Sequence, residues 1–287
     1  MVIFMTIFWS LNYVAAKVAL RSFPPIFYSA LRMIIAGTLM ALVYQIWKRG
    51  KPEMAIGRWS WRELLFLGVL GIFGIVGNQM FFVLGLSRTS VAHASLVIAT
   101  TPVLVLAMAW LRGQEHITGR KALGMMLAIG GVAALNLAPG RSAHGASLIG
   151  DLTVFACSFS FALFTVFSKE HMRRLGAIPI NALGYGVCAL MLIPPVIFRA
   201  RSFDFAAVPP VGWAMLGYMA VFSSVVCYVI YSYALGHMPA SRVASYSYAQ
   251  PFIASLSAWW LLSEPVTPPV AIGGAMVLCG VWLTGRG

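Results

Sequence analysis

Long apolar runs separated by short polar connections most constrain the fold of this sequence. A helix needs about 20 apolar residues to cross the hydrocarbon layer of a bilayer, and a spanning helix satisfies its own backbone hydrogen bonds. The sequence contains ten such runs, over residues 2–20, 25–47, 63–86, 91–111, 119–138, 149–168, 178–198, 211–233, 241–262 and 268–284. The longest connection, residues 48–63, is too short for a soluble domain. We predict an all-α integral membrane protein with ten transmembrane helices.

Charge supports this class and orients it. Hydrophobic residues make up 60% of the chain and charged residues 9%, and the net charge is +13. The Lys and Arg residues lie scattered between apolar runs, which favours topology signals over a nucleic-acid partner. On the side shared by both termini we count thirteen: Lys48, Arg49, Lys51, Arg58, Arg62, Arg112, Arg120, Lys121, Lys169, Arg173, Arg174, Arg242 and Arg286. The opposite side has six, so we expect cytoplasmic termini in a cell (inner) membrane.

An internal repeat divides the chain into two parts. At an offset of 149 residues, Pro102 falls on Pro251, Trp110 on Trp259, and Glu115 on Glu264. The first halves match more weakly, with WSLNYVAAK at 9–17 against FALFTVFSK at 161–169. We therefore predict two five-helix repeats, residues 1–138 and 149–287. An odd number of spans inserts the second repeat from the other side, which is typical of transporters.

The matched prolines predict the position of a substrate site. A proline inside a helix removes one backbone hydrogen bond at about 3 kcal/mol, and hydrocarbon offers no water to replace that bond. In inverted-repeat transporters, paired interruptions of this kind face a cavity. Pro102 and Pro251 are therefore candidate helix-break or gating residues. The alternative is that they only bend the helices around their neighbours.

Polar and aromatic side chains in the apolar runs supply candidate substrate-binding residues. These are Trp9, Asn12, Tyr13, Asn78, Gln79, Tyr228, Tyr231, Tyr246, Tyr248 and Gln250. A face of this kind belongs toward protein or water, because lipid would leave the amides without partners. We expect them to line a central cavity formed by spans 1, 3, 4, 6, 8 and 9. Two alternatives stay open: hydrogen bonds between helices, and for Tyr231 an aromatic belt at the membrane interface.

Charges inside the spans restrict the cargo. Arg32 is an intramembrane charge that could bind an anionic substrate group, although a role in locking helices through carbonyls or a span-end carboxylate is favoured. All seven acidic residues lie in loops or near span ends. A mid-membrane carboxylate would be the natural site for a cationic drug. The cargo is therefore expected to be neutral, zwitterionic or anionic.

Enzyme and cofactor functions find little support. The four cysteines show no C-x-x-C spacing, so neither a disulfide framework nor a metal site is indicated. His93 is the one histidine near a span interior, and no G-x-S-x-G or H-E-x-x-H motif occurs. We expect no cofactor and no catalytic residues. The alternatives to a carrier are a passive channel, a non-transporting scaffold and, with least support, an intramembrane enzyme.

Several motifs together resemble the ten-span EamA-like exporters of the drug/metabolite transporter superfamily. They are W-S-x-N-Y-V-x-x-K in the first run, L-R-M-I-I-A at 31–36, L-x-x-T-S-V-A-x-A-S-L at 86–96, and P-x8-L-R-G-Q-E and P-x8-W-L-L-S-E ending at Glu115 and Glu264. The resemblance implies ten helices with cytoplasmic termini, a cavity between the halves, and export of amino acids or related metabolites. It also implies a few more residues before the first span than this chain has. The expected partners are a small-molecule metabolite and the lipid bilayer, and a homodimer stays open.

Overall fold

The computed structural model describes residues 1–51, 56–137, 147–264 and 267–286. Its elements are α1 (Val2–Ala19), α2 (Pro25–Gly50), η2 (Ile56–Arg58), α3 (Trp61–Gly71), η3 (Ile72–Gly77), α4 (Asn78–Leu86), α5 (Val91–Ile98), α6 (Thr101–Leu111), α7 (Gly119–Leu137), α8 (Leu148–Leu175), α9 (Ala177–Ala200), α10 (Pro210–Tyr218), η5 (Met219–Val226), α11 (Cys227–His237), α12 (Ala240–Ser245), η6 (Tyr246–Ala249), α13 (Gln250–Leu262) and α14 (Pro268–Arg286). Within these ranges there is no strand, so the predicted all-α class is confirmed.

Local sequence explains where several helices begin. Ser60 and Glu63 form a capping box at the start of α3, in which each side chain bonds the other residue's backbone amide. Ser90 and Ser147 accept hydrogen bonds from backbone amides at the starts of α5 and α8. Pro25 begins α2, where its missing amide removes no helical hydrogen bond. These signals fix where the apolar segments enter the bundle.

Among the described residues, seven helical stretches are long and apolar enough to cross a membrane. They are Val2–Ala19, Pro25–Gly50, Trp61–Leu86, Val91–Leu111, Leu148–Leu175, Ala177–Ala200 and Pro210–His237. The other three expected spans correspond to α7, to the interrupted stretch from α12 to α13, and to α14. A multi-pass membrane protein follows from the seven, whereas the count of ten stays a prediction.

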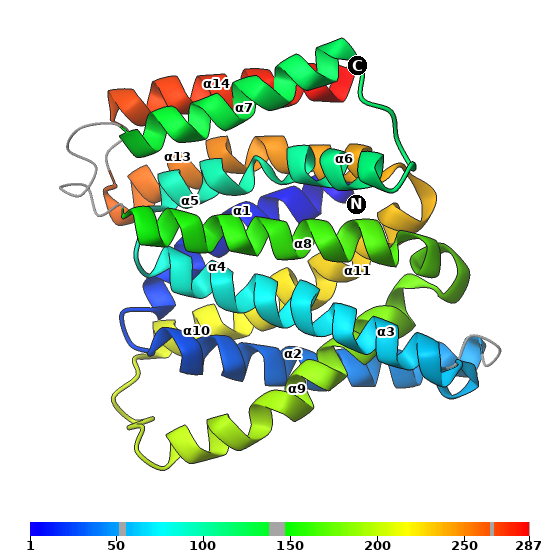
Figure 1. The fold of residues 1–287 in the computed structure, drawn as a ribbon. Helices are drawn as coiled ribbons and strands as arrows, with labels where there is room; N and C mark the ends of the chain where they lie inside the picture. The colour runs from blue at the N-terminus through cyan, green and yellow to red at the C-terminus, as the bar shows by residue number, and fades with distance from the viewer. Residues whose placement is uncertain (52–55, 138–146, 265–266, 287) are drawn as a thin grey trace.

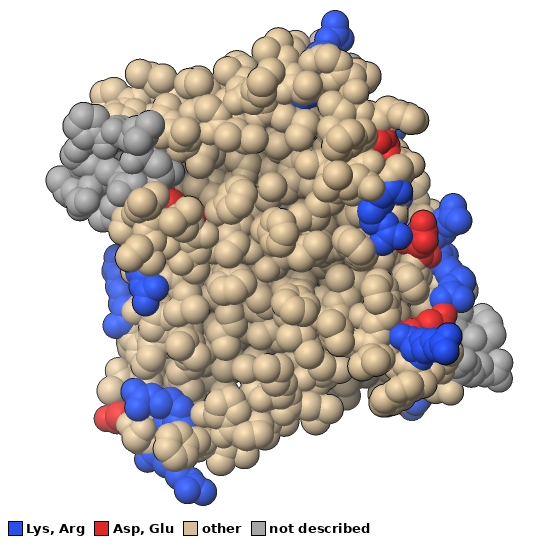
Figure 2. All heavy atoms as spheres, viewed as in Figure 1, with Lys and Arg blue, Asp and Glu red and all other residues tan. Residues whose placement is uncertain are grey.

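The arrangement of charge gives the direction in which the bundle crosses the membrane. The two chain termini lie at the same end of the bundle (Figure 1). On the face drawn in Figure 2, Lys, Arg, Asp and Glu gather at the two ends, and a broad uncharged zone separates them. Such a zone is the surface that hydrocarbon can cover. The helices therefore cross the bilayer from one charged end to the other.

Two π-helical turns occupy corresponding places in the chain. Residues 72–77 form η3, and residues 221–226, at the same offset of 149, lie within η5. A π-turn inserts an extra residue into the helical repeat and is frequent at functional sites. Each one directly precedes a helix that begins with cavity residues, namely α4 and α11.

The helices α7 and α14 pack against each other through glycine. A Cβ atom added at Gly124 would lie 2.3 Å from the Gly280 carbonyl oxygen, and one added at Gly131 would lie 2.7 Å from that of Gly273. Only residues without a Cβ allow backbones to approach so closely. In Figure 1 this pair lies at the edge of the bundle, away from α2 and α9.

Candidate functional site

A cavity lies among the helices of the bundle and collects most of the predicted site residues. Its lining consists of Trp9, Asn12, Tyr13, Arg32, Asn78, Gln79, Phe82, Ile98, Thr101, Cys157, Ser158, Phe161, Tyr228, Ser247 and Gln250. Its volume is about 70 Å³, whereas pockets for drug-sized ligands have about 300–1,000 Å³. This conformation therefore has room for a few water molecules or a very small group, and a larger cargo requires the helices to separate.

Three aromatic rings form one wall of the cavity. The ring centroids of Trp9, Phe161 and Tyr228 lie 5.9 to 6.0 Å apart, and each pair meets nearly edge to face, at 83° to 86°. Edge-to-face packing is a favourable arrangement for aromatic rings. Trp9 Nε1 also donates to the Ser223 carbonyl at 3.1 Å. The wall is therefore preformed, and it draws residues from α1, α8 and α11.

The amide side chains of the cavity already join helices to one another. Tyr228 Oη donates to Asn78 Oδ1 at 2.8 Å, and Asn78 Nδ2 donates to the Cys157 carbonyl at 3.2 Å. Tyr13 Oη donates to Gln250 Oε1 at 3.4 Å. Hydrogen bonds between helices, the alternative role for these residues, are thus present in this conformation. They do not exclude contact with a cargo, because the same residues line the cavity.

Two further polar atoms of the lining have no hydrogen-bond partner among the described residues. These are Asn12 Oδ1 and Ser158 Oγ, both buried. A buried polar atom without a partner costs about 1–3 kcal/mol. Asn12 comes from α1 and Ser158 from α8, so they approach the cavity from opposite halves of the chain. A bound molecule or water could satisfy them.

Arg32 reaches the cavity from α2, a helix that we did not expect to contribute. Its side chain is 1% exposed, and Nε donates to Ser224 Oγ at 2.9 Å. Nη1 has no partner. No carboxylate of the described residues forms an ion pair with it. The sequence favoured a role for Arg32 in joining helices through carbonyls or a carboxylate. In the structure its hydrogen bond is to a hydroxyl, which leaves the guanidinium charge without a counter-charge among the described residues.

The first proline break is repaired within its own segment. In a continuous helix, the amide of residue 102 would donate to the Ile98 carbonyl, but Pro102 has no amide hydrogen. Thr101 Oγ1 donates to that carbonyl at 2.6 Å instead. Pro102 then lies in the first turn of α6, where proline is tolerated. The helix is thereby interrupted between α5 and α6.

The second break is different because the repairing threonine has no counterpart there. Gln250 occupies the position of Thr101 at the offset of 149, and its side chain lies in the cavity. Pro251 lies in the first turn of α13, after the 3₁₀ segment η6. The Thr6 hydroxyl of α1 shares its one hydrogen between the Val2 carbonyl at 3.1 Å and the Tyr246 carbonyl at 3.3 Å, so part of the support comes from another helix.

Two predicted tyrosines, Tyr231 and Tyr246, do not line the cavity. Tyr231 is fully buried behind the aromatic wall, where its hydroxyl bonds Thr165 at 2.9 Å; this position also excludes the interfacial belt. Tyr246 is 38% exposed, because the 3₁₀ segment breaks the helical face that it was expected to share with Gln250. The Tyr248 side chain lies outside the described part of the structure.

Carboxylates at both ends of the bundle bind the starts of helices. Glu264 Oε2 accepts from the Val91 amide at 2.9 Å. Glu115, its counterpart in the repeat, accepts from the Ser241 amide and hydroxyl at 3.3 and 2.5 Å. The Glu264 contact joins the segment after α13 to α5, and the Glu115 contact joins the segment after α6 to α12. Each glutamate thus caps a helix of the other half.

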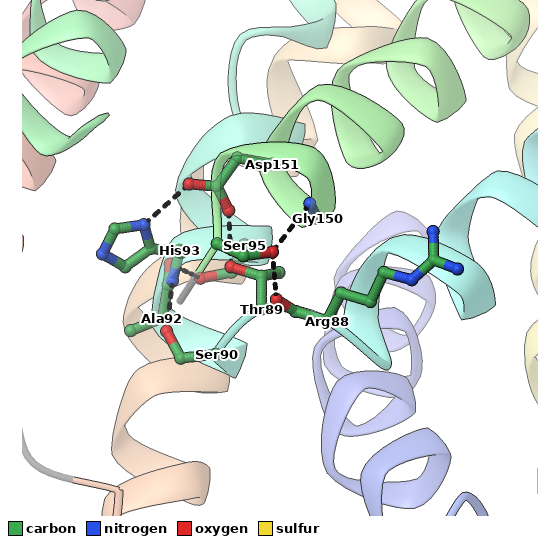
Figure 3. A network of polar contacts seen from close by, with 9 residues as sticks. Arg88, Thr89, Ser90, Ala92, His93, Ser95, Gly150 and Asp151 are labelled. Atoms are coloured by element: carbon green, nitrogen blue, oxygen red, sulfur yellow. Dashed lines mark hydrogen bonds and ion pairs between the residues drawn. The ribbon is translucent and has the colours of Figure 1, made fainter. Parts of the chain in front are cut away.

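The α5 end also contains a buried ionisable pair. Asp151, in the first turn of α8, lies 3.0 Å from His93 Nδ1 and accepts a 2.5 Å hydrogen bond from Thr89. Figure 3 shows the Asp151 carboxylate between these two partners, near the Ser90 cap of α5. Both side chains of the pair are buried. The contact fastens α5 to α8, which supplies three cavity residues.

The comparison with known families accounts for this architecture. The profile of the EamA-like transporter family matches residues 1–137 and 148–286. The chain belongs to the EamA-like transporter family. The resemblance predicted from the motifs is therefore confirmed, and this EamA-like chain is a multi-pass membrane protein with a general transporter role.

Relatives of the EamA-like chain extend over nearly its full length. A protein of Archaeoglobus fulgidus named an uncharacterized transporter is 29% identical, covering 97% of this chain and 95% of its own. The uncharacterized transporter YetK of Bacillus subtilis is 24% identical, with 94% and 81% covered. One solved crystal structure has a TM-score of 0.70 at 19% identity, covering 98% of this chain and 94% of that chain. That likeness shows a shared fold.

Seven lining residues of the EamA-like chain escaped the sequence analysis: Phe82, Ile98, Thr101, Cys157, Ser158, Phe161 and Ser247. Most are apolar or small, so nothing distinguishes them from ordinary packing residues in an apolar run. Phe161 is the exception. It falls on Trp9 in the weaker alignment of the first halves, and the two rings meet in the aromatic wall. The repeat was therefore a usable signal for this residue.

Proposed function

We propose that this EamA-like chain is a secondary transporter that exports small metabolites by alternating access. Residues 1–138 and 149–287 would form two inverted five-helix repeats that rock around the cavity, with both termini in the cytoplasm. The cavity supports this proposal because its lining comes from both parts of the chain. Broken helices at a site between repeats are the arrangement that alternating access uses.

The lining also supports a cargo class. No carboxylate lies among the described residues of the cavity, whereas amide, hydroxyl and aromatic groups and one guanidinium do. A cationic cargo would enter without a counter-charge, at a cost of several kcal/mol. Neutral, zwitterionic and anionic metabolites meet no such penalty. The small cavity volume is consistent with a contracted conformation, in which helices must separate to admit a metabolite.

Two asparagine variants separate binding from packing. The Oδ1 atoms of both asparagines have no partner among the described residues, but only Asn12 lines the cavity. Asn181 lies outside the cavity, and its Nδ2 bonds Ser232 at 2.8 Å and the Ala177 carbonyl at 2.9 Å. Asn12→Leu should abolish export with little loss of stability. Asn181→Leu should lower stability by about 1–3 kcal/mol and retain export in the folded fraction.

The assay compares metabolite release from cells that express the chain with cells that carry an empty vector. Any released compound is then loaded into proteoliposomes to measure exchange. A carrier saturates, and unlabelled compound on the far side accelerates the flux, whereas a passive channel shows neither effect. Equal loss of stability and transport in both asparagine variants would contradict the proposed binding role of the cavity.

A further inference from the structure

The guanidinium of Arg32 is a buried charge whose counter-charge is missing from the described protein. One nitrogen is fixed to Ser224, and Nη1 faces no acceptor. Two of the described carboxylates are engaged elsewhere, Asp151 with His93 and Glu264 with the start of α5. Leaving an arginine unpaired at such depth costs several kcal/mol. An anion bound beside Arg32 would remove this cost.

The cavity is where that anion can lie. Arg32 is the one charged side chain among the described lining residues. A single positive charge in a small, poorly hydrated space matches a single negative charge. Phosphate, with nearly two charges, would bring one more than the site can neutralise. A carboxylate has one charge, and its planar oxygens suit a guanidinium.

The unpartnered atoms of Asn12 and Ser158 add a second requirement. Asn12 Oδ1 accepts hydrogen bonds, and Ser158 Oγ both accepts and donates. Both line the same cavity as Arg32. A cargo with a hydrogen-bond donor beside its carboxylate would satisfy all three groups. The aromatic wall of Trp9, Phe161 and Tyr228 can accommodate an apolar part of the cargo.

We propose that Arg32 binds the carboxylate of the cargo, so that the transporter moves an acid faster than the uncharged amide of the same compound. This inference rests on the proposed transport function. It assigns Arg32 a role in specificity, whereas Ser224 is a positioning residue that fixes the guanidinium through Nε. Removing the carboxylate charge from the cargo should then lower the transport rate as much as removing the guanidinium from the protein does.

The test begins with untargeted metabolite release. Cells expressing the wild-type chain, Arg32→Gln, Arg32→Lys or Ser224→Ala are compared with vector cells, and exported compounds are identified by mass spectrometry. We expect every compound exported by wild type to carry a carboxylate. Arg32→Gln should lower its release about tenfold or more, as expected for loss of a charge-assisted hydrogen bond. Arg32→Lys should retain part of the release, because it keeps the charge.

A matched pair of cargoes removes the ambiguity of misfolding. Proteoliposomes are loaded with the exported acid or with its primary amide, and the ratio of the two rates is measured. The ratio does not depend on how much protein is folded. Wild type should prefer the acid by about tenfold or more, and Arg32→Gln should reduce that preference toward one. Ser224→Ala should reduce the preference less than Arg32→Gln does.

The possible outcomes separate the inference from the transport proposal. Export of compounds that carry no carboxylate, or equal rates for acid and amide in wild type, overturns the role of Arg32 and leaves the transporter intact. A lowered amount of folded Arg32→Gln with an unchanged acid-to-amide ratio assigns Arg32 to packing and also overturns it. No release above vector for any compound, together with no exchange in proteoliposomes, overturns both proposals.

Discussion

Thr101→Val tests whether the first helix break depends on a single hydroxyl. The substitution keeps the shape of the side chain and removes the 2.6 Å hydrogen bond to the Ile98 carbonyl. Pro102 provides no amide for that carbonyl, so it is left without its donor in a region that offers little water. An unsatisfied buried acceptor costs about 1–3 kcal/mol. We expect Thr101→Val to lose that amount of unfolding free energy in detergent.

Thr38→Val is the matched control for this measurement. Thr38 Oγ1 donates to the Ile34 carbonyl at 3.0 Å, but within the continuous helix α2 that carbonyl keeps its backbone donor. Its loss should therefore stay within about 0.5 kcal/mol. Adding Pro102→Ala to Thr101→Val restores an amide and should recover part of the stability. Equal losses in the two single variants would refute our account of the break.

Two further predictions concern the ends of the bundle and the glycine contact. Glu264→Gln should speed hydrogen exchange of the first amides of α5, and Glu115→Gln should do the same for α12, because a neutral acceptor binds an amide more weakly. Each variant should leave the other end unchanged. Hydrogen exchange measured by mass spectrometry tests this, and faster exchange at both ends in either variant would contradict separate contacts. Gly124→Ala should destabilise the protein, since its Cβ would lie 2.3 Å from a backbone oxygen. Gly186→Ala, with nothing within 4 Å of the added atom, should be neutral or stabilising by up to about 1 kcal/mol; similar melting temperatures for the two variants would argue against the close contact.

The helical class could be predicted because the bilayer allows few alternatives. Only helices and closed barrels satisfy backbone groups in hydrocarbon, so runs of about 20 apolar residues determine most of the elements. Seven predicted site residues also come together, among them Trp9, Asn78 and Gln250. Polar and aromatic residues within apolar runs are expected to face protein or water rather than lipid, and such residues can be identified from the sequence alone.

Facing directions and irregular turns could not be predicted in the same way. The helix α2 is apolar on all sides, so its sequence does not show that Arg32 faces the cavity. His93 and Asp151 lie 58 positions apart in the chain, and their contact depends on the rotation of α5 and α8 about their own axes, which the sequence does not reveal. Tyr246 was placed on a regular helical face that the 3₁₀ segment interrupts. Such departures from α-helix leave no periodic signal in the sequence.

The first helix of the chain links the irregular segments of the distant half mechanically. Thr6 of α1 bonds the Tyr246 carbonyl in η6, and one turn further along α1 Trp9 bonds the Ser223 carbonyl in η5. Both are bonds to main-chain oxygen in stretches whose own hydrogen-bonding pattern is irregular. Sliding α1 along its axis by about one residue, 1.5 Å, would break both contacts at once. A displacement of α1 therefore affects η5 and η6 together, so α1 couples the two irregular segments.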